Sequence, residues 1–272
     1  MLSQNSASLT LPDLAALCHV WRAGELGDAS QRSVDTGYAS LNQVLPGGGW
    51  PQGALIELLQ PQPGLDEWGL LAPALAARQA DAPRQLMVLV GAPYLPFGPA
   101  LGARQLNMQR LLAVQAQGPA LLWAVREALQ CADVDSVLAW LPQARSANLR
   151  RLQIAAHAHN KLLFVFRPLG ARQESSPAPL RLLLEGLGGE AGNLAVHVLK
   201  RRGPPLALPV VLATRPARLT ALLAASSERV RRQREETALA LSLPLASPFS
   251  PISPLPRSFL HALDRTASLH SH

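Results

Sequence analysis

The sequence contains little cysteine, little charge and no long apolar run. Its 2 cysteines, Cys18 and Cys131, lie far apart and match no spacing of a metal site. Cys131 follows an apolar segment, where a thiol is usually buried. No apolar stretch approaches the roughly 18 residues that span a bilayer, and the N-terminus does not resemble a secretory signal. We therefore expect a soluble, cytoplasmic protein without membrane attachment, metal or cofactor.

Hydrophobic residues make up 48% of the 272 residues and charged residues only 16%, which is enough apolar surface for one substantial core. Lys and Arg number 25 against 18 acidic residues, so the net charge is +7. A basic balance of this kind favours nucleic acid or an acidic protein surface as a partner.

Apolar runs and amphipathic segments alternate along most of the chain. Strands are predicted at 54–59, 85–90, 134–141, 161–166, 180–187 and 194–199, with a further apolar stretch at 206–214. Helices are predicted at 67–78, 101–110, 121–130, 148–159 and 217–225. In helix 148–159 the inward residues are expected to be Leu149, Leu152, Ile154 and Ala155. This alternation predicts an α/β fold with a mostly parallel sheet.

Composition divides the chain into an N-terminal helix and linker at 1–32, a core at 33–226 and a basic tail rich in Pro and Ser at 227–272. The tail is predicted to be disordered. The N-terminal helix has one apolar stripe, which packs either on its own core or on a partner. Apolar residues expected to contact partners are Leu14, Leu17 and Trp21 in the helix and Phe249, Leu255, Phe259 and Leu260 in the tail.

The stretch GALIELLQPQPGLDEWGLL, 53–71, has the strand, glycine-containing turn and helix of a nucleotide-binding P-loop. That motif needs two glycines, a lysine on the phosphates and a hydroxyl on magnesium. Here Gln60 stands at the first glycine, Leu65 at the second, Asp66 at the lysine and Glu67 at the hydroxyl, with Gly64 inside the turn. The other interpretation is an ordinary turn whose acidic residues complement the helix dipole.

Charge decides what this turn can bind. A unit charge at about 4 Å is worth roughly 4 kcal/mol at an effective dielectric near 20, so an aspartate in place of the lysine costs several kcal/mol. Because about 1.4 kcal/mol is a tenfold change in affinity, we expect ATP binding in the usual manner to be lost.

The order of segments around this turn resembles the start of the RecA core, where a threonine-glycine turn and a glycine-rich loop precede the P-loop strand. Residues 34–42, 49–53 and 55–58 carry that order. The chain is more closely similar to the RecA-like family of SOS-linked ImuA and SulA-like proteins. The blocks that match span 33–203 and cover 49–59, 70–77, 120–141, 149–156, 162–168, 176–182 and 196–203.

The resemblance also places the other catalytic positions of a RecA-type ATPase. The acid that ends the Walker B strand falls on Trp140, and the polar sensor of the next strand falls near Arg167 and Pro168. Phosphoryl transfer depends on placed charges rather than on the fold. Losses at three positions therefore predict a relic nucleotide site and a protein that is not an enzyme.

Basic residues are the remaining candidates for contacts with DNA or an acidic partner, and a solvated surface is the alternative for each. These candidates are Arg150, Arg151, Lys200, Arg201 and Arg202. The last three end a core strand, near the place where RecA-like proteins contact DNA. If duplex DNA binds, a plot of the logarithm of the binding constant against the logarithm of the salt concentration should have a slope of about −0.9 per phosphate neutralised.

The family resemblance implies an accessory protein of SOS-inducible translesion DNA synthesis. Such a protein links an ImuB-like Y-family polymerase and an error-prone DnaE-type polymerase to RecA or damaged DNA, with the tail as a tether, and joins the nucleoid when DNA is damaged. Two alternatives stay open: a SulA-like inhibitor of cell division and a divergent RecA-like ATPase.

Overall fold

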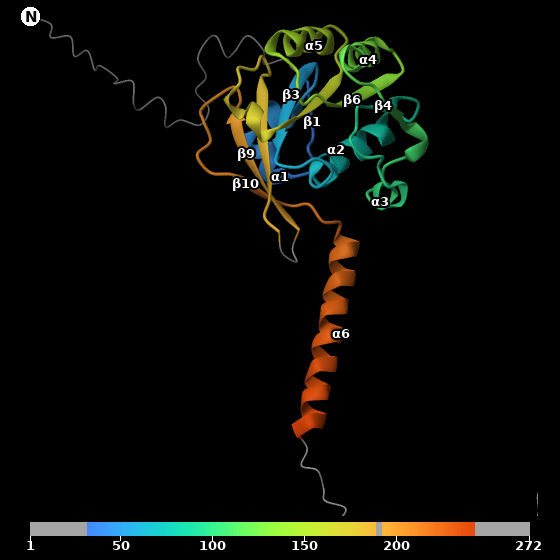
Figure 1. Ribbon diagram of the computed structural model, residues 1–272, viewed down its shortest axis with the longest axis vertical. Helices are drawn as coiled ribbons and strands as arrows, with labels where there is room; N and C mark the ends of the chain where they lie inside the picture. Colours follow the sequence, from blue (N-terminus) through green and yellow to red (C-terminus); the bar gives the residue numbers. More distant parts are fainter. Residues whose placement is uncertain (1–31, 189–191, 243–272) are drawn as a thin grey trace, which may run out of the picture. The chain divides into compact units, whose positions relative to one another are not determined.

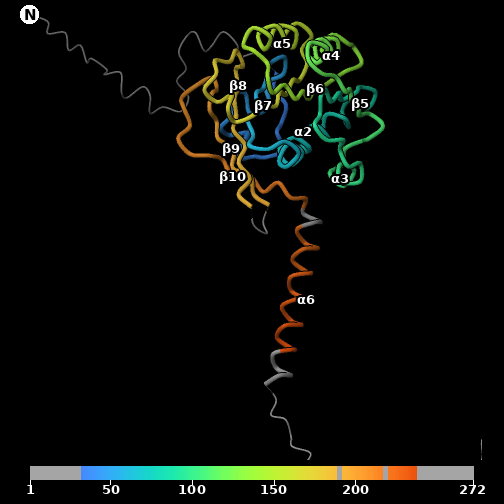
Figure 2. The backbone as a smooth tube through the Cα atoms, in the orientation of Figure 1, coloured from blue at the N-terminus to red at the C-terminus, as the bar shows by residue number. Residues whose placement is uncertain are grey.

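The computed structural model describes residues 32–188 and 192–242, and Figure 2 traces its backbone. At its centre is a mixed sheet with the strand order β10-β9-β8-β3-β7-β6-β4-β5. From β8 to β5 all neighbours are parallel, whereas β9 and β10 are antiparallel at one edge. The strands are β3 (Ala54–Gln60), β4 (Leu86–Val90), β5 (Leu111–Val114), β6 (Val134–Trp140), β7 (Leu162–Pro168), β8 (Leu180–Gly186), β9 (Asn193–Lys200) and β10 (Val210–Ala213). Two short strands, β1 (Ser33–Val34) and β2 (Trp50–Pro51), pair separately.

Helices cover both faces of this sheet (Figure 1). One face carries α1 (Ala39–Val44), α2 (Glu67–Asp81) and α3 (Gly98–Gly102), and the other carries α4 (Pro119–Gln130) and α5 (Ser146–Ala158). Single 3-10 turns lie at Pro46–Gly48, Met108–Arg110 and Leu169–Gln173. The predicted α/β fold with a mostly parallel sheet is confirmed. Within the described ranges no helix has the length and apolarity needed to cross a membrane.

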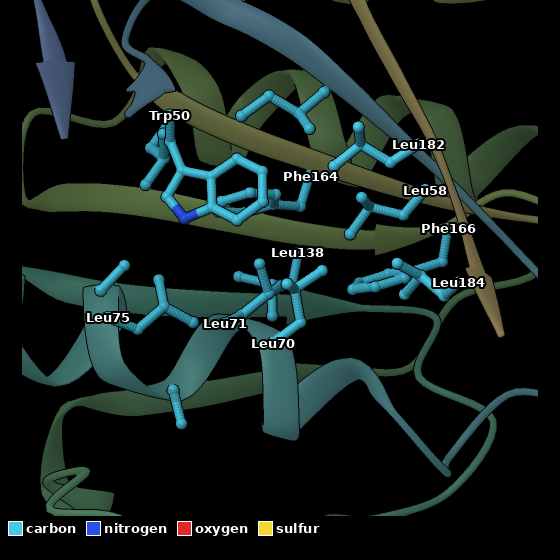
Figure 3. Packing of buried hydrophobic residues seen from close by; sticks show 14 of the residues in the cluster. Trp50, Leu58, Leu70, Leu71, Leu75, Leu138, Phe164, Phe166, Leu182 and Leu184 are labelled. Atoms are coloured by element: carbon cyan, nitrogen blue, oxygen red, sulfur yellow. The ribbon is translucent and has the colours of Figure 1, made fainter. Parts of the chain in front are cut away.

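The core forms because the central strands bury both of their faces. Every residue of β3 is buried, including the polar Glu57 and Gln60 within its mostly apolar sequence. On the α2 side, Leu70, Leu71 and Leu75 point at the sheet beside Trp50 and Phe164 (Figure 3). The ring of Trp50 meets that of Phe164 edge-on, with centroids 5.4 Å apart. This packing fixes the start of α2 against the ends of the strands.

Three local predictions are wrong. Segment 101–110 is not one helix, because α3 ends at Gly102 and Gln105 has a left-handed φ of 68° that interrupts any helix. Ile154 is 62% exposed, since the buried stripe of α5 follows the helical period through Leu149, Leu152 and Ala156 instead. Cys131 is exposed because it stands just beyond the end of α4.

The helix after the core is longer than predicted. Helix α6 covers Ala217–Ser242, so the prediction of disorder from 227 is wrong as far as 242. Its charge-dense part gains helical support from Glu228–Arg232 and Arg231–Glu235, pairs four residues apart. The part of the tail from 243 and the segment 1–31 lie outside the described residues. So do the apolar partner contacts predicted there, Leu14, Leu17, Trp21, Phe249, Leu255, Phe259 and Leu260.

Candidate functional site

The carboxylate of Glu67 is the centre of a buried polar cluster at the start of α2. Its residue is only 1% exposed. The Oε1 atom accepts hydrogen bonds from the backbone N–H of Gly64 at 2.6 Å, from Nε2 of Gln60 at 2.8 Å and from the indole Nε1 of Trp140 at 3.4 Å. All three donors are neutral. The side chain of Glu67 therefore lies over the turn that leads into its own helix.

Two strands, one on each side of β7, bring Gln60 and Trp140 together. Gln60 is the last residue of β3 and Trp140 the last residue of β6. Both strands point in the same direction, so their carboxyl ends lie at the same end of the sheet. Open α/β proteins bind their ligands at this end. Trp140 is held there by Phe166 of β7, whose ring stacks on the indole with centroids 4.5 Å apart and planes at 21°.

The turn itself depends on Gly64. Its φ is +90°, and a Cβ at this position would lie 2.9 Å from the ring of Tyr94. Only glycine combines that backbone conformation with such close packing. The N–H of Gly64 is thereby presented to the carboxylate of Glu67, in the way that a P-loop presents its backbone N–H groups to phosphate. The chain supplies its own anion at this position.

The sequence-predicted relic positions are brought together only in part. Gln60, Gly64, Glu67 and Trp140 form one cluster, but Leu65 has no part in its hydrogen bonds and is 66% exposed. The P-loop origin of the turn stays a prediction.

Asp66 stands beside this cluster and is half-buried. Desolvation raises the pKa of the Asp66 carboxyl, and the neighbouring Glu67 carboxylate raises it further. Asp66 occupies the N-cap position of α2 but makes no side-chain capping hydrogen bond.

Two cavities flank Trp140. One, of about 340 Å³, is lined by Glu67 and Trp140 together with aromatic residues of the loop after β4. The other, of about 190 Å³, lies between Gln60, Phe166 and several prolines. The rim of the larger cavity carries exposed apolar side chains, with exposed fractions between 63% and 74%: Leu65, Tyr94, Leu95 and Phe97. Of these four residues, the sequence assigned only Leu65 to a site.

A second buried carboxylate was also missed. Glu57, in the middle of β3, is 0% exposed and forms ion pairs with Arg167 of β7 at 3.1 Å and Arg181 of β8 at 2.8 Å. Arg167 also contacts the partly exposed Glu174 at 2.7 Å and the carbonyl of Ala144. The sequence signal for this ion-pair network is a charged residue inside each of three mostly apolar strands, β3, β7 and β8. Arg167, which the resemblance placed near the sensor position, thus belongs to a structural network.

The candidate DNA-contacting residues have different environments. Arg150 and Arg151 are exposed on α5. By contrast, Nζ of Lys200 donates to the carbonyl of Ser176 at 3.0 Å. Arg201 is half-buried, donates through Nε to the carbonyl of Pro204 and also contacts the carbonyl of Val44. Arg202 is exposed. Lys200 and Arg201 thus fasten loops to the sheet edge, and DNA contact by any of these residues stays a prediction.

Within 32–188 and 192–242 no group of three or more His, Cys, Asp or Glu side chains is placed to hold a metal ion. The polar cluster holds one carboxylate among neutral donors. A scan of the sequence against protein-family models and a search of the curated proteins both return no match.

Proposed function

We propose that this protein is a non-catalytic adaptor of damage-induced translesion DNA synthesis, built on a RecA-like core whose nucleotide site is closed. One observation carries the proposal: the Glu67 carboxylate accepts the Gly64 N–H, the kind of donor that a nucleotide phosphate would need. Because the Glu67 carboxylate already occupies this position, we propose that the core binds partner proteins and not a nucleotide.

The energetics of this arrangement oppose nucleotide binding. A phosphate entering the turn meets the negative charge of Glu67, with Asp66 beside it and no lysine in the turn. At about 4 Å and an effective dielectric near 20, each such repulsion is worth roughly 4 kcal/mol. One repulsion of that size lowers affinity by nearly a thousandfold. Hydrolysis of ATP therefore has no support in the site.

The identity of the partners is proposed from the sequence resemblance. The ordered blocks between 33 and 203 resemble those of the RecA-like ImuA and SulA-like proteins, and the mostly parallel sheet is compatible with a RecA-like core. The partners proposed on this basis are an ImuB-like Y-family polymerase, an error-prone DnaE-type polymerase, RecA and damaged DNA.

Affinity purification of the full-length chain from cells with damaged DNA tests this proposal. Mass spectrometry should find the two polymerases or RecA enriched over a mock purification, and more strongly than in undamaged cells. Enrichment of the tubulin-like division GTPase instead would favour the SulA-like alternative. Recovery of none of these partners after crosslinking would contradict the adaptor proposal.

A further inference from the structure

The larger cavity beside Trp140 is lined by Glu67, and one oxygen of this buried carboxylate has no partner. Oε2 of Glu67 is buried and accepts no hydrogen bond, although Oε1 accepts three. Among residues 32–188 and 192–242, no Lys, Arg or His forms an ion pair with Glu67. A buried carboxylate that is not matched by a cation is costly. The cavity therefore favours a ligand that brings positive charge and N–H donors to this oxygen.

The walls of the cavity suit the rest of a basic side chain. Trp68, Tyr94, Phe97 and Trp140 line it together with Glu67. Aromatic faces attract guanidinium and ammonium groups, and the aliphatic stem of arginine or lysine packs well on apolar surface. A volume of about 340 Å³ is at the lower end for ligand sites, which fits one side chain better than a nucleotide.

We propose that this cavity binds an arginine or lysine side chain of a protein partner, with apolar residues next to it resting on the exposed rim. This inference rests on the adaptor function proposed above and names the chemistry by which a partner is held. The cation pairs with Oε2 of Glu67, and the rim residues Leu65, Tyr94 and Phe97 contact the flanking residues of the partner. Burial of an exposed apolar rim adds affinity.

Other occupants fit less well. An anion meets the charge of Glu67, and a purely apolar group leaves Oε2 unpaired. The cation that already lines the cavity, Arg104, donates through Nη1 to the carbonyl of Thr214 at 3.0 Å and has no hydrogen bond to Glu67. Since Oε2 is closed to water, pairing with the partner's cation requires a local movement of the side chains around Glu67 when the partner binds.

The test is a titration of the full-length, ¹⁵N-labelled protein with N-acetyl-arginine methylamide, observed by NMR. The indole N–H signal of Trp140, assigned through Trp140→Phe, should shift and saturate. The citrulline analogue has the same length but no charge, and it should bind about tenfold or more weakly, since charged hydrogen bonds are worth about 1.5–3 kcal/mol.

Two variants identify the contacts. Glu67→Gln should bring the arginine and citrulline affinities together, whereas Glu127→Gln, an exposed carboxylate on α4, should leave them unchanged. Phe97→Ala changes a residue that is 72% exposed, so it should fold normally, as its spectrum will verify, and weaken both ligands. No saturable shift, equal binding of the two ligands by the unaltered protein, or an arginine preference that survives Glu67→Gln would each overturn the proposal.

The affinity purification and the arginine titration together separate this inference from the adaptor function. If the polymerases co-purify but the arginine probe does not bind, only the proposed binding of a basic side chain in the cavity, the basic anchor, is wrong. If the probe binds as predicted but no polymerase or RecA is recovered, the anchor stands and the adaptor function falls.

Discussion

Among the residues that the structure describes, two carboxylates are almost completely buried, and their surroundings differ. Glu57 lies in the middle of the sheet between two guanidinium groups, at 2.8 and 3.1 Å. Glu67 lies at the end of the sheet, next to a cavity, and only neutral donors meet it. Both residues are 1% exposed or less. Burial alone therefore does not distinguish a structural carboxylate from a candidate binding group.

The difference lies in how completely each charge is matched. Each oxygen of Glu57 contacts a guanidinium, so any change there leaves charges without a partner inside the core. Glu67 has one oxygen without a hydrogen bond, and its residue lines a cavity. Glu57 therefore links β3 with β7 and β8, whereas a ligand for Glu67 stays a proposal. Four substitutions test this comparison.

The largest effect is expected for Glu57→Gln. It removes the only negative charge that contacts Arg181 and leaves Arg167 with the partly exposed Glu174, as far as the described residues show. Breaking a buried ion pair on one side costs about 3–5 kcal/mol, so the free energy of unfolding in urea should fall by that amount. Glu174→Gln is the matched control and should cost less than about 1 kcal/mol, since its side chain is 54% exposed. Equal effects of the two substitutions would contradict the assigned role of Glu57.

Gly64→Ala should be next in size. The left-handed backbone and the nearby ring of Tyr94 make a Cβ unfavourable, at a cost of about 1–2 kcal/mol. Gly102, which ends α3 without a positive φ and has open space at its Cβ position, provides the control. Gly102→Ala should leave the unfolding free energy unchanged or raise it. A tolerated Gly64→Ala would show that the turn does not need its present shape.

Glu67→Gln should change the unfolding free energy by no more than about 1 kcal/mol. The amide oxygen of glutamine can still accept the Gly64 N–H, while the unmatched charge disappears. A comparison of its urea unfolding curve with that of Glu57→Gln tests the contrast directly. A loss for Glu67→Gln as large as that for Glu57→Gln would mean that Glu67 is also a structural charge.

Asp66→Asn should have the smallest effect, and that effect should depend on pH. The pKa of Asp66 is raised above its ordinary value of 3.8 in the folded protein, so its ionised form costs stability. The stability that Asp66 contributes is complete below pH 3.8 and is lost as pH rises through the folded pKa. Asp66→Asn should therefore stabilise the protein slightly near neutral pH, by less than about 1 kcal/mol because water screens the half-buried group, and give no gain below pH 3.8. Thermal unfolding across this pH range provides the measurement, and a gain that persists in acid would show another cause.

Local patterns predicted most of the sheet, because β4 is an uninterrupted apolar run and strands such as β3 and β6 are mostly apolar. Alignment of the turn with a P-loop also predicted that Gln60, Glu67 and Trp140 belong to one site. The inward position of the Glu67 side chain could not be predicted, since it depends on the turn at Gly64.

Long-range pairs were beyond sequence reasoning. Glu57 is separated by 110 residues from Arg167 and by 124 from Arg181, so nothing local links them. The error at α6 had a different origin. Prolines after 243 are typical of a disordered segment, but α6 ends before them and contains ion pairs at helical spacing.

In the proposed function Glu67 closes the nucleotide position, and calorimetry of the full-length protein with ATP and magnesium tests that role. We predict no saturable heat at millimolar nucleotide. A micromolar dissociation constant would contradict the account, because it would require the phosphates to be held in a turn that already contains a carboxylate.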